Sequence, residues 1–168
     1  MKIKLAVFDV DGVLTDGTIS YTAEGETLKT FHAHDGFGLN LLMKAGIAVG
    51  VISGRGSAPL EKRMADLNIR RLYMGCRDKV AALEEMCRDV DCDLSDVAYM
   101  GDDLIDYKAM QVVGMKLAPA NAVDDIKEIA DHITQASGGV GAVREAAEYL
   151  LLRAGIKPLD LASDVFKQ

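Results

Sequence analysis

Runs of apolar residues alternate with segments of helical periodicity along most of the chain. The first run predicts a strand over 5–10, in which four consecutive apolar residues leave no polar face. Similar runs predict further strands over 47–54, 70–75, 96–103 and 114–120, and a short edge strand over 132–135. Between them, apolar residues at helical spacing predict helices over 36–45, 57–68, 78–90, 104–112, 123–129 and 140–154. Strands that alternate with helices indicate an α/β fold, a Rossmann-like parallel sheet sandwiched by helices.

Residues 18–31 break this alternation. Two strand-like stretches, TISYT and ETLKTF, flank the sequence AEG, which predicts a small β-hairpin. No repeat, low-complexity tract or linker divides the chain, so we expect one domain over 1–168. The tail over about 155–168 shows the weakest pattern, and we expect it to be mobile or to lie on a neighbouring subunit.

Charge and composition narrow the class of partner. The chain carries 19 Lys and Arg against 26 Asp and Glu, and the net charge of −7 argues against nucleic acid and anionic membrane surfaces. No stretch approaches the roughly 20 apolar residues of a membrane span, and the first strand begins too early for a signal peptide. The cysteines are odd in number and lack a zinc-like spacing, which favours reduced thiols in a cytoplasmic protein.

Polar side chains gather where the predicted strands end. In chain order they are Asp9 and Asp11, then Ser53, Gly54 and Arg55, then Lys79, then Asp102 and Asp103, with Asp106 one helical turn later. The carboxyl ends of parallel strands meet at one edge of the sheet, which is where ligands bind in such folds. Carboxylates placed so close together raise each other's pKa and cost stability unless a cation lies among them. We therefore expect Mg²⁺ and Lys79 at this edge.

Phosphoryl transfer is the chemistry that needs this set of groups. Mg²⁺ takes hard oxygen ligands and reduces the repulsion between a phosphate and a carboxylate nucleophile. A carboxylate can attack phosphorus to give an aspartyl-phosphate, and a second acid can protonate the leaving alcohol and then activate water. A hydroxyl, a lysine and backbone N–H groups can stabilise the phosphoryl oxygens.

The order of these groups resembles the four motifs of the haloacid dehalogenase superfamily of phosphohydrolases, which match FDVDGVLTDG, ISGR, Lys79 and GDDLID. The resemblance implies that Asp9 is the nucleophile and a metal ligand. It implies that Asp11 is the general acid and base and gives its main-chain carbonyl to Mg²⁺. Asp102 would also bind the metal.

The same resemblance assigns supporting roles to the remaining motif residues. Ser53 and Lys79 would hold the phosphoryl group. Asp103 would lie beside the metal ligand, and Asp106 would orient Lys79 or Asp103. The gaps between Asp9, Ser53 and Lys79 are too short to hold a cap domain, so we expect an open site. Such a site would either act on macromolecules or use a lid from a neighbouring subunit, and the hairpin at 18–31 is the candidate lid.

Longer stretches resemble one subfamily, the uncapped, tetrameric 3-deoxy-D-manno-octulosonate 8-phosphate phosphatases. They are DVDGVLTDGTISY, HDGFGLNLL, ISGR, GDDLIDYKAM and GGVGAVREAAEYLLL. The resemblance implies an eight-carbon sugar acid phosphate from lipopolysaccharide precursor synthesis as substrate, a homotetramer whose subunits complete each other's sites, and a glycine-rich segment like 138–144 that closes over the site. The candidate substrate-binding residues are Thr15, Gly54, Arg55 and Arg63.

Arg55 favours the eight-carbon substrate because a sister group that acts on nine-carbon keto-deoxy sugar acid phosphates tends to carry Glu there. A cation at this position could meet the carboxylate of the sugar acid. The nine-carbon substrate remains the alternative. The pair Tyr107-Lys108 departs from the Trp-Pro type pair expected in close relatives, but it lies away from the motif carboxylates.

Other classes and simpler interpretations stay open. A signalling receiver domain would place its phospho-acceptor after the third strand, where this chain has YMGCRD. A non-catalytic scaffold would not need both Asp9 and Asp11, and a phosphotransferase would share the aspartyl-phosphate. Asp103 and Asp106 could complement a helix dipole. Arg55 and Arg63 could be surface charges, and His32 and His34 could lie at an interface or near substrate.

Overall fold

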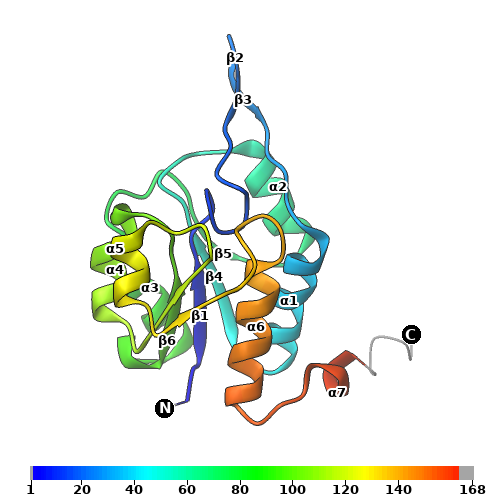
Figure 1. Ribbon diagram of the computed structural model, residues 1–168, viewed down its shortest axis with the longest axis vertical. Coiled ribbons are helices and arrows are strands. Elements are labelled where there is room, and N and C mark those ends of the chain that lie inside the picture. Colours follow the sequence, from blue (N-terminus) through cyan, green and yellow to red (C-terminus); the bar gives the residue numbers. More distant parts are fainter. Residues whose placement is uncertain (1, 163–168) are drawn as a thin grey trace.

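A computed structural model describes residues 2–162 and shows a central sheet between two layers of helices (Figure 1). The strands of this sheet are β1 (Leu5–Phe8), β4 (Ala48–Ile52), β5 (Arg71–Tyr73), β6 (Val97–Met100), β7 (Met115–Ala118) and β8 (His132–Ile133). They are parallel and run in the order β5-β4-β1-β6-β7-β8. Strand β1 lies between β4 and β6, in register with Leu5 opposite Ala48 and Val97. The predicted α/β fold with a parallel sheet is confirmed.

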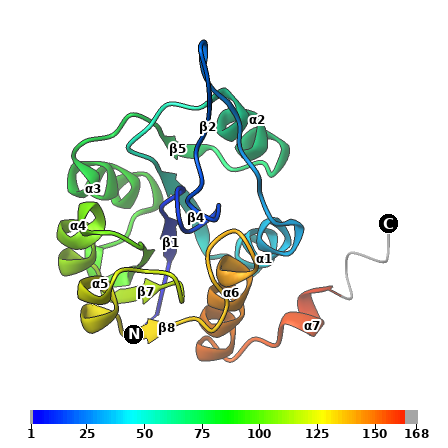
Figure 2. The same ribbon diagram turned by 45° about the horizontal axis from the view of Figure 1, so that its top comes forward.

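The two faces of the sheet are covered by different helices (Figure 2). One layer holds α1 (Ala33–Lys44), α2 (Ala58–Asp66) and α6 (Ala142–Arg153); the other holds α3 (Lys79–Val90), α4 (Tyr107–Val112) and α5 (Asp124–Ile129). Two 3₁₀ turns, η1 (Leu94–Asp96) and η2 (Leu104–Asp106), flank β6. Ala6 and Phe8 of β1 belong to the core under the first layer, and Leu5 and Val7 to the core under the second. This alternation is why β1 is apolar at every position.

The hairpin stands away from the helices at the carboxyl end of the sheet (Figure 1). Its strands are β2 (Ser20–Thr22) and β3 (Gly25–Leu28), which pair antiparallel. Ile19, Tyr21 and Leu28 expose much of their apolar surface. The predicted hairpin is therefore present, and its tip contributes little to the core.

Most elements begin or end one to a few residues away from the sequence prediction, and three of the differences bear on the packing. Strand β1 stops at Phe8, because the carbonyl of Val10 accepts hydrogen bonds from residues 13–15 and turns the chain. Helix α1 begins at Ala33, three residues earlier than predicted. The tail forms α7 (Pro158–Ala162), which contacts α1 and α6, and residues 163–168 lie outside the described residues. Within residues 2–162 the helices are too short or too polar to cross a lipid bilayer.

The early start of α1 brings a buried carboxylate to the N-terminus of α6. Asp35 is only 1% exposed, and its Oδ1 accepts a hydrogen bond from the backbone N–H of Arg144 at 2.8 Å. The residue that precedes α6 is Gly141, which has no side chain to cap the helix. Asp35, a residue of α1, therefore caps the N-terminus of α6. This cap also holds residues 138–141, which precede α6 and pack against the loop after β1.

We expect Asp35→Ala to lower the free energy of unfolding by about 1–2 kcal/mol, because it removes a helix cap. Urea unfolding monitored by circular dichroism measures this change. Glu84→Ala removes an exposed carboxylate from the surface of α3 and serves as the control. Equal unfolding midpoints for the two variants would contradict the capping role.

Candidate active site

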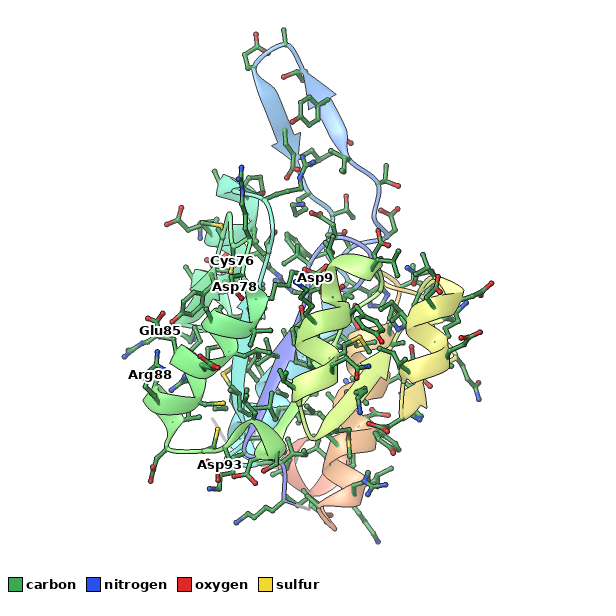
Figure 3. All side chains as sticks on the ribbon, turned by 90° about the vertical axis from the view of Figure 1, so that its left-hand side faces the viewer. Asp9, Cys76, Asp78, Glu85, Arg88 and Asp93 are labelled. Carbon is green, nitrogen blue, oxygen red and sulfur yellow. The ribbon has the colours of Figure 1, made fainter. Side chains whose placement is uncertain are left out.

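A buried ammonium group lies between two carboxylates at the end of β1. Asp9 directly follows β1 and is 3% exposed, while Lys79 is the first residue of α3. Lys79 Nζ donates hydrogen bonds to Asp9 Oδ1 at 2.7 Å and to Asp106 Oδ1 at 2.6 Å. Figure 3 shows Asp9 at the end of the sheet that faces the hairpin. Asp78, the residue before α3, lies at the same end. Residues 70 positions apart thus form one ion pair.

Asp106 has donors on both of its carboxylate oxygens. Its Oδ1 also accepts the hydroxyl of Tyr99 at 2.6 Å, and its Oδ2 accepts the backbone N–H groups of Asp102 at 3.1 Å and Asp103 at 3.4 Å. Asp106 is fully buried, so these bonds replace its hydration. It therefore orients Lys79 and shapes the loop after β6. Tyr99 was missed at the sequence level, because an apolar strand position gave no sign of a polar partner.

The remaining carboxylates fit a divalent cation. Oxygens of Asp9, Asp102 and Asp106 lie within 4.8 Å of one another. Asp106 has both oxygens occupied by donors, so Asp9 and Asp102 are the pair with oxygens left for a metal. Asp102 Oδ1 is buried, and no hydrogen-bond partner for it exists in the described part of the chain. Such oxygen ligands suit Mg²⁺.

Gly12 lets the loop after β1 close on Asp102. Its φ is +89°, and a Cβ there would lie 1.9 Å from Asp102 Oδ2. A side chain at this position would push the carboxylate away or open the loop. Glycine is therefore required both by the backbone conformation and by the close approach to the metal site.

Burial dominates the electrostatics of these acids. The pKa of Asp9 is raised to about 7 by burial and by the charge of Asp106, against the opposing effect of Lys79. The pKa of Asp102 is also raised to about 7, by burial and by the charges of Asp9 and Asp106. Burial would lower the pKa of Lys79, but the two carboxylates beside it raise the pKa above its ordinary value. One lysine is too little positive charge for this cluster.

A cavity of about 230 Å³ opens over the carboxylates. Its lining combines acids, one cation, glycines and isoleucines: Asp9, Asp11, Gly17, Ile19, Gly54, Arg55, Asp102, Asp103 and Ile105. Five of the residues predicted for catalysis, metal or substrate binding therefore line one cavity together with Asp103. A sugar-sized anion could reach Asp9 there if a metal ion and Arg55 offset the acids.

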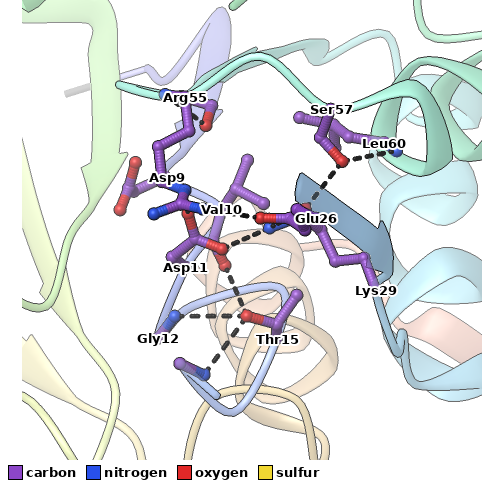
Figure 4. Close-up of polar contacts among 12 residues, drawn as sticks. Asp9, Val10, Asp11, Gly12, Thr15, Glu26, Lys29, Arg55, Ser57 and Leu60 are labelled. Atoms are coloured by element: carbon purple, nitrogen blue, oxygen red, sulfur yellow. Dashed lines mark hydrogen bonds and ion pairs between the residues drawn. The ribbon is translucent and has the colours of Figure 1, made fainter. Parts of the chain in front are cut away.

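The base of the hairpin adds charged groups that the sequence did not indicate. Lys29 donates to Asp11 Oδ1 at 2.5 Å and lies 3.2 Å from Glu26 Oε1 (Figure 4). Glu26 Oε2 accepts from Arg55 Nη2 at 2.9 Å, and Glu26 Oε1 accepts the hydroxyl of Ser57 at 3.0 Å. The stretch ETLK offered opposite charges three residues apart, but nothing local tells that they fold back on Asp11.

Five predicted residues lie away from the cavity lining: Lys79 and Asp106, which are described above, and Thr15, Ser53 and Arg63. Thr15 is 2% exposed, and its Oγ1 accepts the N–H groups of Gly12 and Gly17 and donates to the carbonyl of Val10. Its hydroxyl shapes the loop after β1, and its contact with substrate stays a prediction. Ser53 Oγ is buried and accepts the N–H of Arg55 at 3.2 Å.

Arg63 lies on α2, and its guanidinium packs against α1, because a Cβ added to Gly36 would lie 2.4 Å from Arg63 Nη2. It lines a narrow groove with His32 and Asp35, outside the cavity over the carboxylates, and its contact with substrate stays a prediction. His32 and His34 pack edge to face with ring centroids 5.0 Å apart.

Asp103 has two interpretations from sequence, a neighbour of the metal ligand and an acid at a helix N-terminus. In the structure it caps η2 through its Oδ1 and also lines the cavity, so the two interpretations are compatible.

The glycine-rich segment packs directly on the loop after β1. A Cβ at Gly138 would lie 1.9 Å from the carbonyl oxygen of Gly12, and the N–H of Gly139 donates to the carbonyl of Val13 at 3.2 Å. Asn121 joins the two segments, because its Nδ2 donates to the carbonyl of Gly12 at 2.9 Å and its Oδ1 accepts the N–H of Gly138 at 2.6 Å. In this chain the segment therefore packs against the loop that follows β1 and carries Gly12.

The chain is similar to known phosphatases along most of its length. A family model described as haloacid dehalogenase-like hydrolase matches residues 75–145. The 3-deoxy-D-manno-octulosonate 8-phosphate phosphatase of Haemophilus influenzae is 40% identical over 154 residues, which are 92% of this chain and 86% of that protein. The phosphatase of the same name from Yersinia pestis is 42% identical over 151 residues, 90% of this chain and 81% of that protein.

Solved structures share the fold. The cobalt-bound Haemophilus influenzae phosphatase gives a TM-score of 0.89 at 40% identity, covering 92% of this chain and 90% of that one. The Moraxella catarrhalis phosphatase, in complex with a magnesium ion, a phosphate ion and a KDO molecule, gives 0.89 at 38% identity, covering 98% and 94%. A Legionella pneumophila hydrolase described as a putative member of the same superfamily gives 0.92 at 40% identity, covering 99% and 91%.

The raised pKa values predict that the metal-free protein loses stability as pH rises. Between about pH 4 and 7 the folded chain keeps protons on Asp9 and Asp102 that the unfolded chain has released. The free energy of unfolding should fall over this range, by up to about 1.4 kcal/mol per pH unit for each group, and level off above pH 7. Mg²⁺ should restore stability at pH 8, because it binds the folded chain.

Urea unfolding in EDTA at pH 5 and pH 8, with and without added Mg²⁺, measures both effects. Asp102→Asn serves as the comparison and should show a weaker pH dependence and a smaller response to Mg²⁺. If the metal-free wild-type protein lost no more stability between pH 5 and pH 8 than Asp102→Asn does, the assignment would be contradicted.

Proposed function

The chain belongs to the 3-deoxy-D-manno-octulosonate 8-phosphate phosphatases of the haloacid dehalogenase-like hydrolases, and we propose that it hydrolyses 3-deoxy-D-manno-octulosonate 8-phosphate to the free sugar acid and phosphate. The observation that carries this proposal is the set of buried Asp9, buried Lys79 and half-buried Asp102 at the carboxyl ends of β1 and β6. A nucleophile, a place for a divalent cation and a fixed ammonium group lie together there.

In the proposed reaction, Asp9 attacks the phosphorus atom and forms an aspartyl-phosphate. Lys79 holds Asp9 and is positioned to stabilise negative charge on the phosphoryl oxygens. Asp9, Asp102 and the main-chain carbonyl of Asp11 would hold Mg²⁺. When bound, Mg²⁺ supplies the positive charge that lets an anionic phosphate approach an anionic carboxylate.

Asp11 is the proposed general acid and base. It lines the cavity beside Asp9 and is less buried than Asp9. As the phosphorus–oxygen bond to the sugar breaks, Asp11 gives its proton to the departing oxygen. The resulting carboxylate then takes a proton from water, which attacks the aspartyl-phosphate and releases phosphate.

The substrate preference rests on Arg55. Its side chain lines the cavity after β4, across β1 from Asp102 and Asp103, which follow β6, and the carboxylate of a sugar acid could pair with it. Gly54 lies beside it on the same wall, and Ser53 and Lys79 are the proposed contacts of the phosphoryl group. A nine-carbon keto-deoxy sugar acid phosphate remains the second candidate, because the cavity alone does not distinguish one carbon atom.

We also propose a homotetramer in the cytoplasm. The hairpin leaves the body with its apolar side chains Ile19, Tyr21 and Leu28 exposed, and Ile105 is exposed at the cavity mouth. Neighbouring subunits that cover these side chains would also close the open site. The three cysteines are free thiols, which suits a reducing compartment. Light scattering that gives the mass of a single chain would overturn the tetramer.

We expect Asp9→Asn to lower turnover at least about 10³-fold while the protein stays folded, because it removes the nucleophile. Phosphate release with Mg²⁺ is measured on eight-carbon and nine-carbon keto-deoxy sugar acid phosphates, hexose phosphates and p-nitrophenyl phosphate. The eight-carbon substrate should give the highest kcat/KM.

Asp124→Asn removes an exposed carboxylate from α5 and controls for charge. Asp9→Asn that keeps near wild-type turnover would refute the nucleophile. A preference for the nine-carbon substrate would keep the mechanism and overturn the substrate. No release from any compound by the folded, Mg²⁺-loaded protein would favour a non-catalytic scaffold.

A further inference from the structure

Two charged residues at the base of the hairpin lie behind the cavity wall. The side chain of Lys29 is 3% exposed and that of Glu26 is 6% exposed. Neither residue lines the cavity, whereas Asp11 and Arg55, which they contact, both do. Lys29 and Glu26 are therefore placed to act on substrate through other residues.

We propose that Lys29 and Glu26 are positioning residues that hold Asp11 for proton transfer and Arg55 for substrate binding. This inference rests on the proposed function, because it takes Asp11 as the general acid and base. It assigns the hairpin a role within its own subunit, in addition to any contact it makes with a neighbour.

The geometry fixes which oxygen of Asp11 is free. Lys29 Nζ occupies Oδ1 at 2.5 Å, whereas Oδ2 lies 3.8 Å from Arg55 Nε, beyond a direct hydrogen bond. Oδ2 is thus the oxygen left to carry the proton to the leaving group. Without Lys29, the carboxylate of Asp11 could rotate about its side-chain bonds, and neither oxygen would be held toward the leaving group.

Glu26 ties this arrangement to the body of the protein. Its Oε1 accepts the hydroxyl of Ser57, the residue that caps the N-terminus of α2, and it also meets Lys29. Its Oε2 accepts from Arg55. Burial works to raise the pKa of Glu26, but its partners Ser57, Lys29 and Arg55 lower that pKa below its ordinary value, so Glu26 stays ionised.

The four side chains form one connected set of ion pairs. Two carboxyl groups, Asp11 and Glu26, face two cations, Lys29 and Arg55. A simpler interpretation is that these ion pairs only hold the hairpin in place. The two interpretations differ in which step of the reaction slows when Lys29 is changed.

Proton donation matters for a poor leaving group and not for a good one. The sugar alcohol needs a proton to leave, whereas an aryl oxide such as p-nitrophenolate leaves without one. We expect Lys29→Met to lower kcat on the sugar acid phosphate about 10-fold or more with KM within about twofold. The first-turnover release of aryl oxide, from an aryl phosphate that the wild-type protein turns over, should stay within about twofold.

Three further variants make the comparison specific. Lys29→Arg keeps the cation and should recover most of kcat. Lys62→Met removes an exposed lysine from α2 and should match the wild type. Glu26→Gln should lower kcat and also raise KM about threefold or more for the sugar acid phosphate, because it releases both Lys29 and Arg55. An unchanged KM in Glu26→Gln would overturn the link to Arg55.

Equal losses in first-turnover aryl release and in sugar phosphate turnover, or no loss in either, would overturn the role of Lys29. If Lys29→Met does not fold, Lys29→Gln keeps the hydrogen bonds and replaces it, and failure of both to fold would show a structural role and overturn the proposal. A wild-type protein without phosphatase activity would instead refute the proposed function.

Discussion

The ion cluster of Asp9, Lys79 and Asp106 is the constraint on which the rest of the site depends. Lys79 Nζ lies within 2.7 Å of both carboxylates, and all three side chains are at most 5% exposed. Removing charges from water is costly, and attraction compensates only when every group is well paired. Asp106 is satisfied by four donors, whereas Asp9 shares the ammonium group of Lys79 with Asp106 and lies near Asp102. This shortage of positive charge is what makes the site a place for a divalent cation.

The fold supplies this cluster from residues that are far apart in the sequence. Strand β1 lies in the centre of the sheet, so Asp9 leaves it among neighbours on both sides. Helix α3 brings Lys79, and the turn after β6 brings Asp102 and Asp106. The loop after β1 then closes on Asp102 at Gly12, and the glycine-rich segment at Gly138 supports that loop. The position of Asp9 therefore depends on backbone segments that approach too closely for a side chain at Gly12 or Gly138.

Sequence motifs predicted the residues whose position follows from a strand end. Asp9, Asp102 and Lys79 come together because parallel strands share one carboxyl edge, which spacing reveals. Thr15 and Arg63 lie outside the cavity lining, because the direction of a side chain depends on turns and helix faces that periodicity does not resolve, and their contact with substrate stays a prediction. Lys29, Glu26 and Asp35 each contact an element distant in sequence, and nothing in the local pattern indicates that partner. Tyr99 lies seven residues from its partner Asp106, but an apolar strand position gives no sign of a polar contact.

Covalent capture of the intermediate tests the central claim that Asp9 is the nucleophile. The wild-type protein with Mg²⁺ is mixed with excess aryl phosphate, quenched in acid within milliseconds, reduced with borohydride and digested for mass spectrometry. We predict that the acyl phosphate is found at Asp9, as the homoserine that reduction leaves there. A burst of aryl oxide with Asp9 unchanged, or with the modification on another carboxylate such as Asp102, would contradict the account.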